Sequence, residues 1–473
     1  MKKADVGWLR APWVWTLLLL SCWKTPLIAQ TFPAGAPMDP SGGFGGDPGS
    51  AQMVTVSAAS LENILQRLEA LEAQQAKAAA PEWEDVSSQK FTVKVGGRIM
   101  GDYIMFPTRH APQDFQNYVE LRRLRLFMAG EGYGVYFYKF DLGFEPEANE
   151  DEPDSAVAVK DILIGARDVP WLGKVELGYV KMPFSLEVLT SSKYISFLER
   201  ALPTNYLPVR KLGFRSTNHS ADESLFWQWA VFFDDFDAIE HQRVGDAQGV
   251  SVVGRAVTTP YYCQDGRYFV HFGLMGSWTS DRDHRVRMRT RPETHEGPRF
   301  VDSGTLLVDD YFDMGAQMAV NWGPFSVQSE LFWRHTQGPA GNYDFYGAYA
   351  FASYFITGEH RAYKRSAAHF DRLKPYTNFW IVRGQDGVDW GWGAWQILAR
   401  WSFYDVSNAP LQGTLPVPDN PYAGVETNVA VGVNWYWNPY ARVMLDWTYA
   451  WADYNHTPNG ELSILGIRFQ VDW

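Results

Sequence analysis

The residues best suited to bind a ligand in this sequence are basic side chains, several of them arginines at every second position. They are Lys94, Arg98, Arg122, Arg123, Arg125, Arg289 and Arg291. An arginine stays charged at any ordinary pH, and its planar fork of N–H groups matches the oxygens of a phosphate or carboxylate. A series of such groups along a narrow, low-dielectric passage attracts anions without trapping them at one point. We therefore expect these residues to line a pore and bind small anions.

Acidic residues near these arginines offer a second interpretation. Asp102, Asp141 and Glu330 fall on the polar faces of predicted strands, where basic residues also lie. Ion pairs between them would neutralise the arginines, which would then only stiffen the fold. For any single arginine the two interpretations are equally good, whereas the whole set favours anion binding.

The sequence contains no recognised catalytic or metal-binding motif. A glycine-rich phosphate loop, a His-Glu-x-x-His helix and a Gly-x-Ser-x-Gly elbow are all missing, and the 10 histidines are scattered. Of the 2 cysteines, Cys22 lies in a segment expected to be removed, which leaves Cys263 without a disulfide partner. We therefore expect no enzymatic activity, no cofactor and no metal site.

The elements that position the basic residues are predicted from a two-residue period that starts near Lys90. In residues 134–144, for example, Tyr136 and Leu142 share an apolar face, and Lys139 lies on the opposite, polar face. Roughly sixteen such segments, separated by turn residues, follow one another to the C-terminus. No helical stretch long enough for a crossover intervenes, so neighbouring strands should be antiparallel.

Composition favours a membrane barrel over a soluble β-sandwich. The chain has 473 residues, is 16% aromatic and contains 21 Trp, yet its mean hydropathy is only −0.27. A helical membrane protein needs about 20 consecutive apolar residues per span, and no such run follows the N-terminus. A barrel needs only alternating apolar positions, with aromatic residues near the membrane surfaces. The net charge of −12 argues against nucleic-acid binding, which requires a basic face.

The end of the chain has the pattern of a barrel-closing strand. Apolar residues alternate up to a terminal aromatic, at Leu465, Ile467, Phe469, Val471 and Trp473. Closure is required in lipid because the open edge of a sheet cannot satisfy its hydrogen bonds there. The predicted fold is therefore an all-β transmembrane antiparallel barrel of about 16 strands over residues 90–473, preceded by a short coiled-coil helix.

Three shorter segments precede the predicted barrel. Residues 1–29 combine a positive start with a short apolar core, which predicts a signal peptide; lipidation of Cys22 is an alternative. Residues 30–56 are rich in Pro, Gly and Ser and predict a flexible tether. Residues 57–80 carry leucines at spacings of three and four, typical of a short coiled-coil helix.

Several segments of the chain resemble the phosphate-selective porin O and P family. In order along the sequence they are Val95–Asp102, Glu120–Leu126, Lys181–Glu187, Phe197–Arg200, Arg289–Glu293, Thr357–Tyr363 and Gly432–Tyr436. The resemblance implies a sixteen-stranded barrel in the cell outer membrane, assembled as a homotrimer, with an arginine-lined lumen. The family positions matched among the basic residues are Arg98, Arg122, Arg123, Arg289 and Arg291.

The resemblance also implies a loop folded into the lumen that narrows each pore. Residues 184–207 lie between two predicted strands and are the best candidate, with Lys193 and Arg200 as charges at the constriction; an extracellular cap is the alternative. One position departs from the family pattern. Phosphate-specific relatives carry a lysine directly after the Ser-Leu-Glu stretch, where this chain has Val188. The departure weakens phosphate specificity but not general anion permeation.

These observations predict an outer-membrane porin for passive diffusion of small anions, such as phosphate or polyphosphate. Its expected partners are the lipid bilayer, the permeating anions and two further copies of the chain, and no nucleic acid. Two alternatives remain open at this stage. One is a general or nutrient-specific porin without phosphate selectivity, and the other is a structural barrel whose N-terminal segments tether the outer membrane.

Overall fold

The computed structural model describes most of the predicted barrel region. The described residues are 67, 91–145, 157–207, 209–233, 249–280, 285–339, 341–384, 387–410 and 422–473. The predicted signal peptide and tether lie outside these residues, as does the predicted coiled coil apart from Arg67. The chain divides into two units, Met1–Gln74 and Gln75–Trp473, and the strands all belong to the second.

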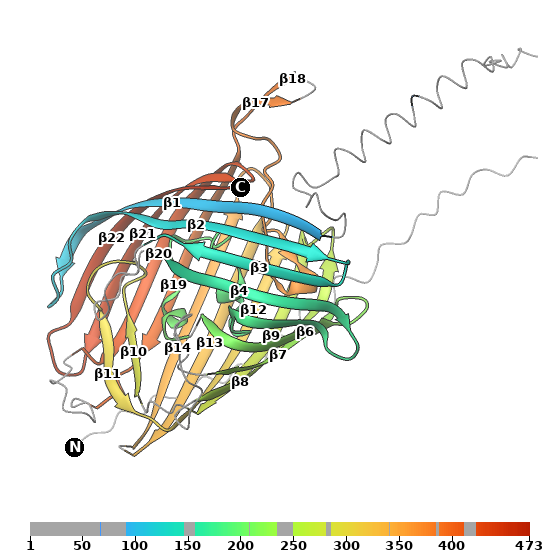
Figure 1. The fold of residues 1–473 in the computed structure, drawn as a ribbon. Coiled ribbons are helices and arrows are strands. Elements are labelled where there is room, and N and C mark those ends of the chain that lie inside the picture. Colours follow the sequence, from blue (N-terminus) through green and yellow to red (C-terminus); the bar gives the residue numbers. More distant parts are fainter. Residues whose placement is uncertain are drawn as a thin grey trace, which may run out of the picture. The chain divides into compact units, whose positions relative to one another are not determined.

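Sixteen strands of the described part of the chain close into one barrel (Figure 1). They are β1 (Phe91–His110), β2 (Tyr118–Gly132), β3 (Tyr136–Gly143), β4 (Ala158–Val169), β5 (Gly173–Lys181), β6 (Arg210–His219), β7 (Leu225–Phe233), β8 (Val250–Cys263), β9 (Tyr268–Ser280), β12 (Asp310–Trp322), β13 (Phe325–Gly338), β14 (Gly341–Phe355), β19 (Ala394–Asp405), β20 (Gly424–Asn438), β21 (Ala441–Tyr454) and β22 (Gly460–Asp472). Each strand pairs antiparallel with the next, and β22 pairs antiparallel with β1 to close the ring. The predicted barrel of about sixteen antiparallel strands is confirmed.

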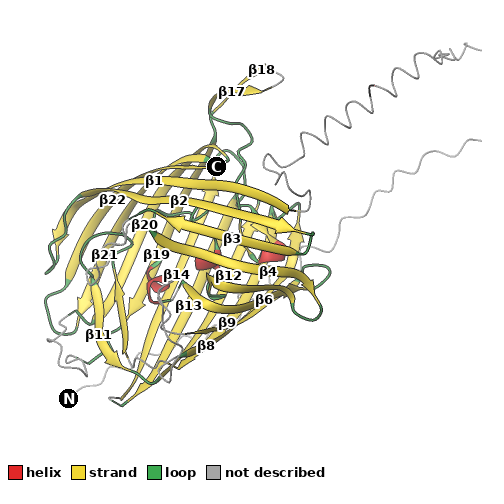
Figure 2. Ribbon diagram, in the orientation of Figure 1, coloured by secondary structure: helices red, strands yellow, loops and turns green. Residues whose placement is uncertain are grey.

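The remaining elements are short and lie in the connections between barrel strands (Figure 2). Three two-stranded sheets pair β10 (Arg285–Thr290) with β11 (Val301–Leu307), β15 (Tyr363–Lys364) with β16 (His369–Phe370), and β17 (Trp380–Gly384) with β18 (Gly387–Gly391). The helical pieces are α2 (Leu186–Leu189), η1 (Leu202–Tyr206) and η2 (Arg365–Ala367). Among the described residues, no helix has the length and apolar character needed to span a bilayer.

Side chains on the barrel strands alternate between an apolar outer face and a polar interior. On β19, Trp401 is 42% exposed, whereas its neighbour Arg400 is 3% exposed. On β21, Trp447 points outward and Asp446 is buried. The outward aromatic residues suit a lipid-facing surface, because Trp and Tyr gather at membrane interfaces. The interior collects the charged residues that the alternation predicted.

Three connections fold back into the barrel, and the two described below enter from opposite ends; the third joins β9 to β12, and its Glu293 contacts Arg400 on the inner face of β19. The end that carries the tight turns 323–324 and 439–440 and the C-terminus is called the turn end here, and the opposite end the loop end. Residues 182–207, called the inner loop, enter from the loop end between β5 and β6. Residues 359–374, called the turn-end segment, enter between β14 and β19, and the β17–β18 hairpin that follows stands clear of the barrel wall (Figure 1).

Candidate functional site

The inner loop packs against one side of the barrel interior. Its backbone N–H at Leu186 donates to Glu330 on β13 over 2.7 Å, and that at Leu198 donates to Asp446 on β21 over 2.7 Å. On β20, Asn434 donates to a backbone carbonyl of the loop. The loop therefore covers the wall formed by β13 to β22 and leaves open space along the opposite wall.

That open space is a cavity of about 1220 Å³, lined by β1 to β7, the inner loop and short parts of two other connections. We call it the channel cavity. Basic residues dominate its lining: fifteen Lys and Arg stand against five Asp and Glu. The basic residues are Arg98, Arg122, Arg123, Arg125, Lys139, Lys160, Arg167, Lys174, Lys181, Arg200, Arg210, Arg215, Arg291, Arg299 and Lys364. The acidic residues are Asp141, Glu145, Asp161, Asp168 and Glu176.

A β-bulge in β2 brings consecutive arginines to the same face. Arg123 pairs with Met100 of β1 and Glu120 pairs with Asp102, so β2 has one residue more than β1 between these pairs. The extra residue shifts the alternation, and both Arg122 and Arg123 turn inward. A strict two-residue period along β2 would turn Arg122 away from the face that carries Arg123 and Arg125. The bulge is the physical reason that Arg122 lies on the inward face.

Glu199 of the inner loop holds Arg122 and Arg123 together with Arg468 of β22, which does not line the channel cavity. Arg122 donates to it from Nε over 2.6 Å, Arg468 from Nη2 over 2.9 Å, and Arg123 Nη2 lies 3.6 Å away. Burial disfavours the charged form of Glu199, but the three guanidiniums outweigh it and hold its pKa well below the usual range. The cluster fixes the end of the inner loop to β2 and β22.

Further along the cavity wall, basic side chains outnumber the carboxylates that they contact. Arg98 donates from Nη1 to the Ser192 hydroxyl of the inner loop over 2.6 Å. Asp161 on β4 accepts from Arg210 Nε over 2.5 Å and also from the Lys139 ammonium. Asp141 lies 3.4 Å from Lys139 and 3.8 Å from Arg98, so three cations share two carboxylates and leave a net positive charge at this point of the wall.

Two other cations of the channel cavity bond only to backbone carbonyls among the described residues. Lys181 donates to Val188 O over 2.7 Å, and Arg200 donates to Glu187 O and Thr190 O, each over 3.0 Å. Burial lowers the pKa of Arg200 to about 10, which still leaves it charged at neutral pH. No carboxylate in the described part of the chain forms an ion pair with either residue, so the positive charge of Arg200 is not balanced by a direct ion pair.

The channel cavity brings together six of the nine basic residues predicted from the sequence. These six are Arg98, Arg122, Arg123, Arg125, Arg200 and Arg291. Lys94 is exposed near the start of β1. Arg289 lies on β10, which is not a barrel strand, and it does not line the channel cavity. Lys193 lines a separate cavity. Lys181 was overlooked, although it stands in the family-like segment Lys181–Glu187 and could have been found there.

Two arginines on the opposite wall, Arg468 and Arg400, have carboxylate partners. Arg468 donates through two nitrogens to Asp102, over 2.7 and 2.5 Å. Arg400 on β19 lies 2.5 Å from Glu293. For these arginines the ion-pair interpretation describes the structure. Glu330, expected on the same grounds to pair with arginine, instead accepts hydrogen bonds from the inner loop.

One group of side chains among the described residues has the composition of a metal site. Donor atoms of Glu120, His295 and Glu296 lie within 4.8 Å of one another. Here His295 Nδ1 and Glu120 Oε2 form a hydrogen bond of 2.6 Å, which links the connection after β10 to β2. Arg291 and Arg299, which line the channel cavity, belong to the same connection.

Comparison with known proteins is consistent with this geometry. The family model described as phosphate-selective porin O and P matches residues 93–473. A Caulobacter vibrioides protein is 29% identical over 62% of this chain, and the match spans only 57% of that relative. Porin O of Pseudomonas aeruginosa is 24% identical over 79% of this chain and 86% of its own length.

Solved barrel structures show lower identity. OmpT, an outer membrane protein of Vibrio cholerae, matches at 11% identity and a TM-score of 0.48, covering 83% of this chain and 100% of OmpT. An anion-selective porin from Comamonas acidovorans matches at 10% identity and a TM-score of 0.48, covering 81% of this chain and 100% of that porin. The family match spans most of the chain, so the protein belongs to the phosphate-selective porin O and P family.

Proposed function

We propose that this outer-membrane porin lets small anions, phosphate among them, diffuse passively through the channel cavity. The observation that carries the proposal is the excess of fifteen Lys and Arg over five Asp and Glu in the cavity lining. The chain as a whole has the opposite balance, with a net charge of −12. A cleft lined by one sign of charge between low-dielectric walls concentrates ions of the other sign.

The arrangement of cations suits an oxyanion that moves from site to site. Arg122 and Arg123 lie side by side, and Arg98, Lys181 and Arg200 line the same cavity. Neighbouring guanidiniums can share the oxygens of one phosphate. Most of these groups already have protein partners, which keeps binding weak enough for release.

Val188 bears on whether phosphate is preferred. Its side chain is 1% exposed, so it adds nothing polar to the cavity. The Lys181 ammonium, however, lies 2.7 Å from the Val188 carbonyl oxygen. A cation therefore occupies the neighbourhood in which phosphate-specific relatives place their extra lysine, and this supports phosphate passage without that lysine. We further propose a homotrimer without enzymatic activity, in keeping with the family.

The test is the reversal potential of the purified protein in planar bilayers under a potassium chloride gradient. We expect anion selectivity, weakened in Arg98→Gln and Arg123→Gln. The matched control is Arg109→Gln, because Arg109 lies near the loop end of β1, outside the channel cavity, and donates to Phe106 O and Asn117.

Added phosphate distinguishes a porin that binds phosphate from a general anion porin. If phosphate reduces chloride conductance, phosphate binds within the cavity. Anion selectivity without that block would leave a general anion porin. Cation selectivity of the unmodified protein would refute the proposal.

A further inference from the structure

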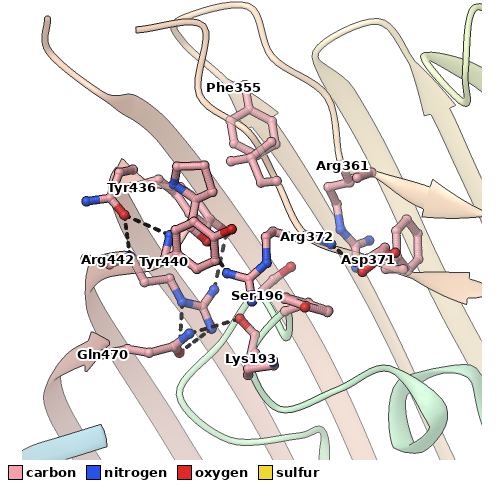
Figure 3. A pocket seen from close by; sticks show the side chains of 17 residues that line it. Lys193, Ser196, Phe355, Arg361, Asp371, Arg372, Tyr436, Tyr440, Arg442 and Gln470 are labelled. Atoms are coloured by element: carbon pink, nitrogen blue, oxygen red, sulfur yellow. Dashed lines mark hydrogen bonds between the residues drawn. The ribbon is translucent and has the colours of Figure 1, made fainter. Parts of the chain in front are cut away.

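A second cavity, of about 30 Å³, lies beside the inner loop near the turn end (Figure 3). It shares no lining residue with the channel cavity. The inner loop separates the two spaces, since Ser191 and Ser192 line the channel cavity and Lys193 and Tyr194 line the smaller one. The turn-end segment and β20 to β22 complete the wall. We call this space the turn-end cavity.

Positive charge exceeds negative charge around the turn-end cavity. Four basic residues line it, with Asp371 as the one carboxylate among the lining residues. Two of the four, Lys193 and Arg372, form ion pairs with Asp472, which lies just outside the lining. The other two, Arg361 and Arg442, have no ion pair with a carboxylate in the described residues.

Arg361 is held rigidly with part of its guanidinium unpartnered. Its guanidinium carbon lies 3.4 Å from the ring centre of Phe370 and 4.8 Å from that of Phe351. Nη2 donates to Gln328 Oε1 over 2.9 Å. Nη1 is buried, and no acceptor among the described residues reaches it. The whole residue is only 7% exposed, and a buried charged donor without an acceptor is costly.

Arg442 lies on a different side of the cavity from Arg361 (Figure 3). Its acceptors are neutral: Gln470 Oε1 at 2.9 Å from Nη2, and Ile195 O at 2.8 Å from Nη1. These bonds fix the guanidinium but do not offset its charge. Two buried guanidiniums around one small space therefore leave a positive potential there that the described residues do not neutralise.

We propose that the turn-end cavity binds one small inorganic anion of chloride size, which accepts a hydrogen bond from Arg361 Nη1. A cavity of about 30 Å³ has room for a monatomic anion such as a halide. The bound anion links the turn-end segment, the inner loop and β21. It stabilises the protein and is separate from the permeation pathway, so it does not depend on the proposed function.

The direct test is crystallography of the full-length protein in bromide, whose anomalous scattering identifies the ion. We expect a bromide peak at hydrogen-bonding distance from Arg361 Nη1. Peaks confined to the channel cavity, or a water molecule at this position, would overturn the proposal. This measurement uses the unmodified protein and needs no variant to fold.

A second test measures the unfolding midpoint as bromide replaces gluconate at constant ionic strength. The midpoint should rise with the logarithm of bromide concentration, by roughly 2 °C per tenfold increase above the dissociation constant. Arg361→Gln should remove most of this rise. The control is Arg255→Gln, because Arg255 is also buried, donates to Ala368 O over 2.7 Å and lines neither cavity. An equal rise in Arg361→Gln would refute the assignment.

Discussion

Glu199→Gln is the substitution that most directly tests how the inner loop and the arginines depend on each other. The Glu199 carboxylate lies 2.6 Å from Arg122, 2.9 Å from Arg468 and 3.6 Å from Arg123. Removing its charge leaves three guanidiniums without a common counter-ion. We expect two consequences: the channel cavity becomes more attractive to anions, and the inner loop is held less firmly.

The magnitudes follow from elementary electrostatics. One unit charge at roughly 6 Å, in a water-filled passage with an effective dielectric near 60, changes an anion's energy by about 1 kcal/mol, or about fivefold in affinity. The half-saturation concentration of single-channel conductance should fall by about that factor. Removing one partner from a buried ion pair costs about 3 kcal/mol or more, so the midpoint of heat unfolding should also fall. The single-channel current should flicker as the loop moves.

Glu145→Gln is the matched control for this experiment. Glu145 lines the channel cavity, which Glu199 does not. It pairs with Arg125 at 2.6 Å, and among the described residues it forms no hydrogen bond or ion pair with the inner loop. The Glu145→Gln variant should therefore increase anion affinity to a similar degree without making the single-channel current flicker. If Glu199→Gln left the half-saturation concentration unchanged, the arginines would not be the groups that attract the anion. If both variants flickered equally, Glu199 would not anchor the loop.

Three further predictions concern single residues. Lys181→Met should lower anion selectivity in reversal-potential measurements more than Arg125→Gln does. The reason is that Lys181 has no carboxylate partner among the described residues, whereas Arg125 is paired with Glu145. An equal or smaller effect of Lys181→Met would contradict this. Burial raises the pKa of Glu187 to about 7, so the folded state binds this proton more tightly than the unfolded state does. The unfolding midpoint should therefore fall as the pH rises from 5 to 7. Glu187→Gln should flatten that fall, and a midpoint that changes with pH as in the unmodified protein would exclude this residue as its source. Gly97→Ala should lower the unfolding midpoint and the yield of closed barrel, because a Cβ there would lie 2.5 Å from the Trp473 ring; an unchanged midpoint would show that the closing strand tolerates the clash.

The alternation of the strands was predictable from sequence because it depends on local backbone geometry. Outward Trp401 and inward Arg400, for example, follow directly from the two-residue period. The inward turn of Arg122 was not predictable in this way. It depends on a bulge, which is set by how β2 pairs with β1. The sequence of residues 118–132 alone does not specify that pairing. Lys94 shows the converse. The two-residue period places it on the same face of β1 as Arg98, but it lies too near the start of the strand to reach the channel cavity.

The position of the inner loop explains why the sequence alone could not identify which inward-facing arginines line the channel cavity. Arg468 and Arg123 both lie on inward faces of strands with similar patterns. The loop covers Arg468, which donates to Leu198 O of the loop and to Asp102, and so it has no free edge for a solute. Arg123 borders the space that the loop leaves open. Which arginine lines the channel cavity is therefore decided by long-range contacts of the loop, such as those of Glu199 and Glu330, more than by the strand that carries the arginine. A variant that moved the loop would change the selectivity of the pore even with every lumen arginine in place.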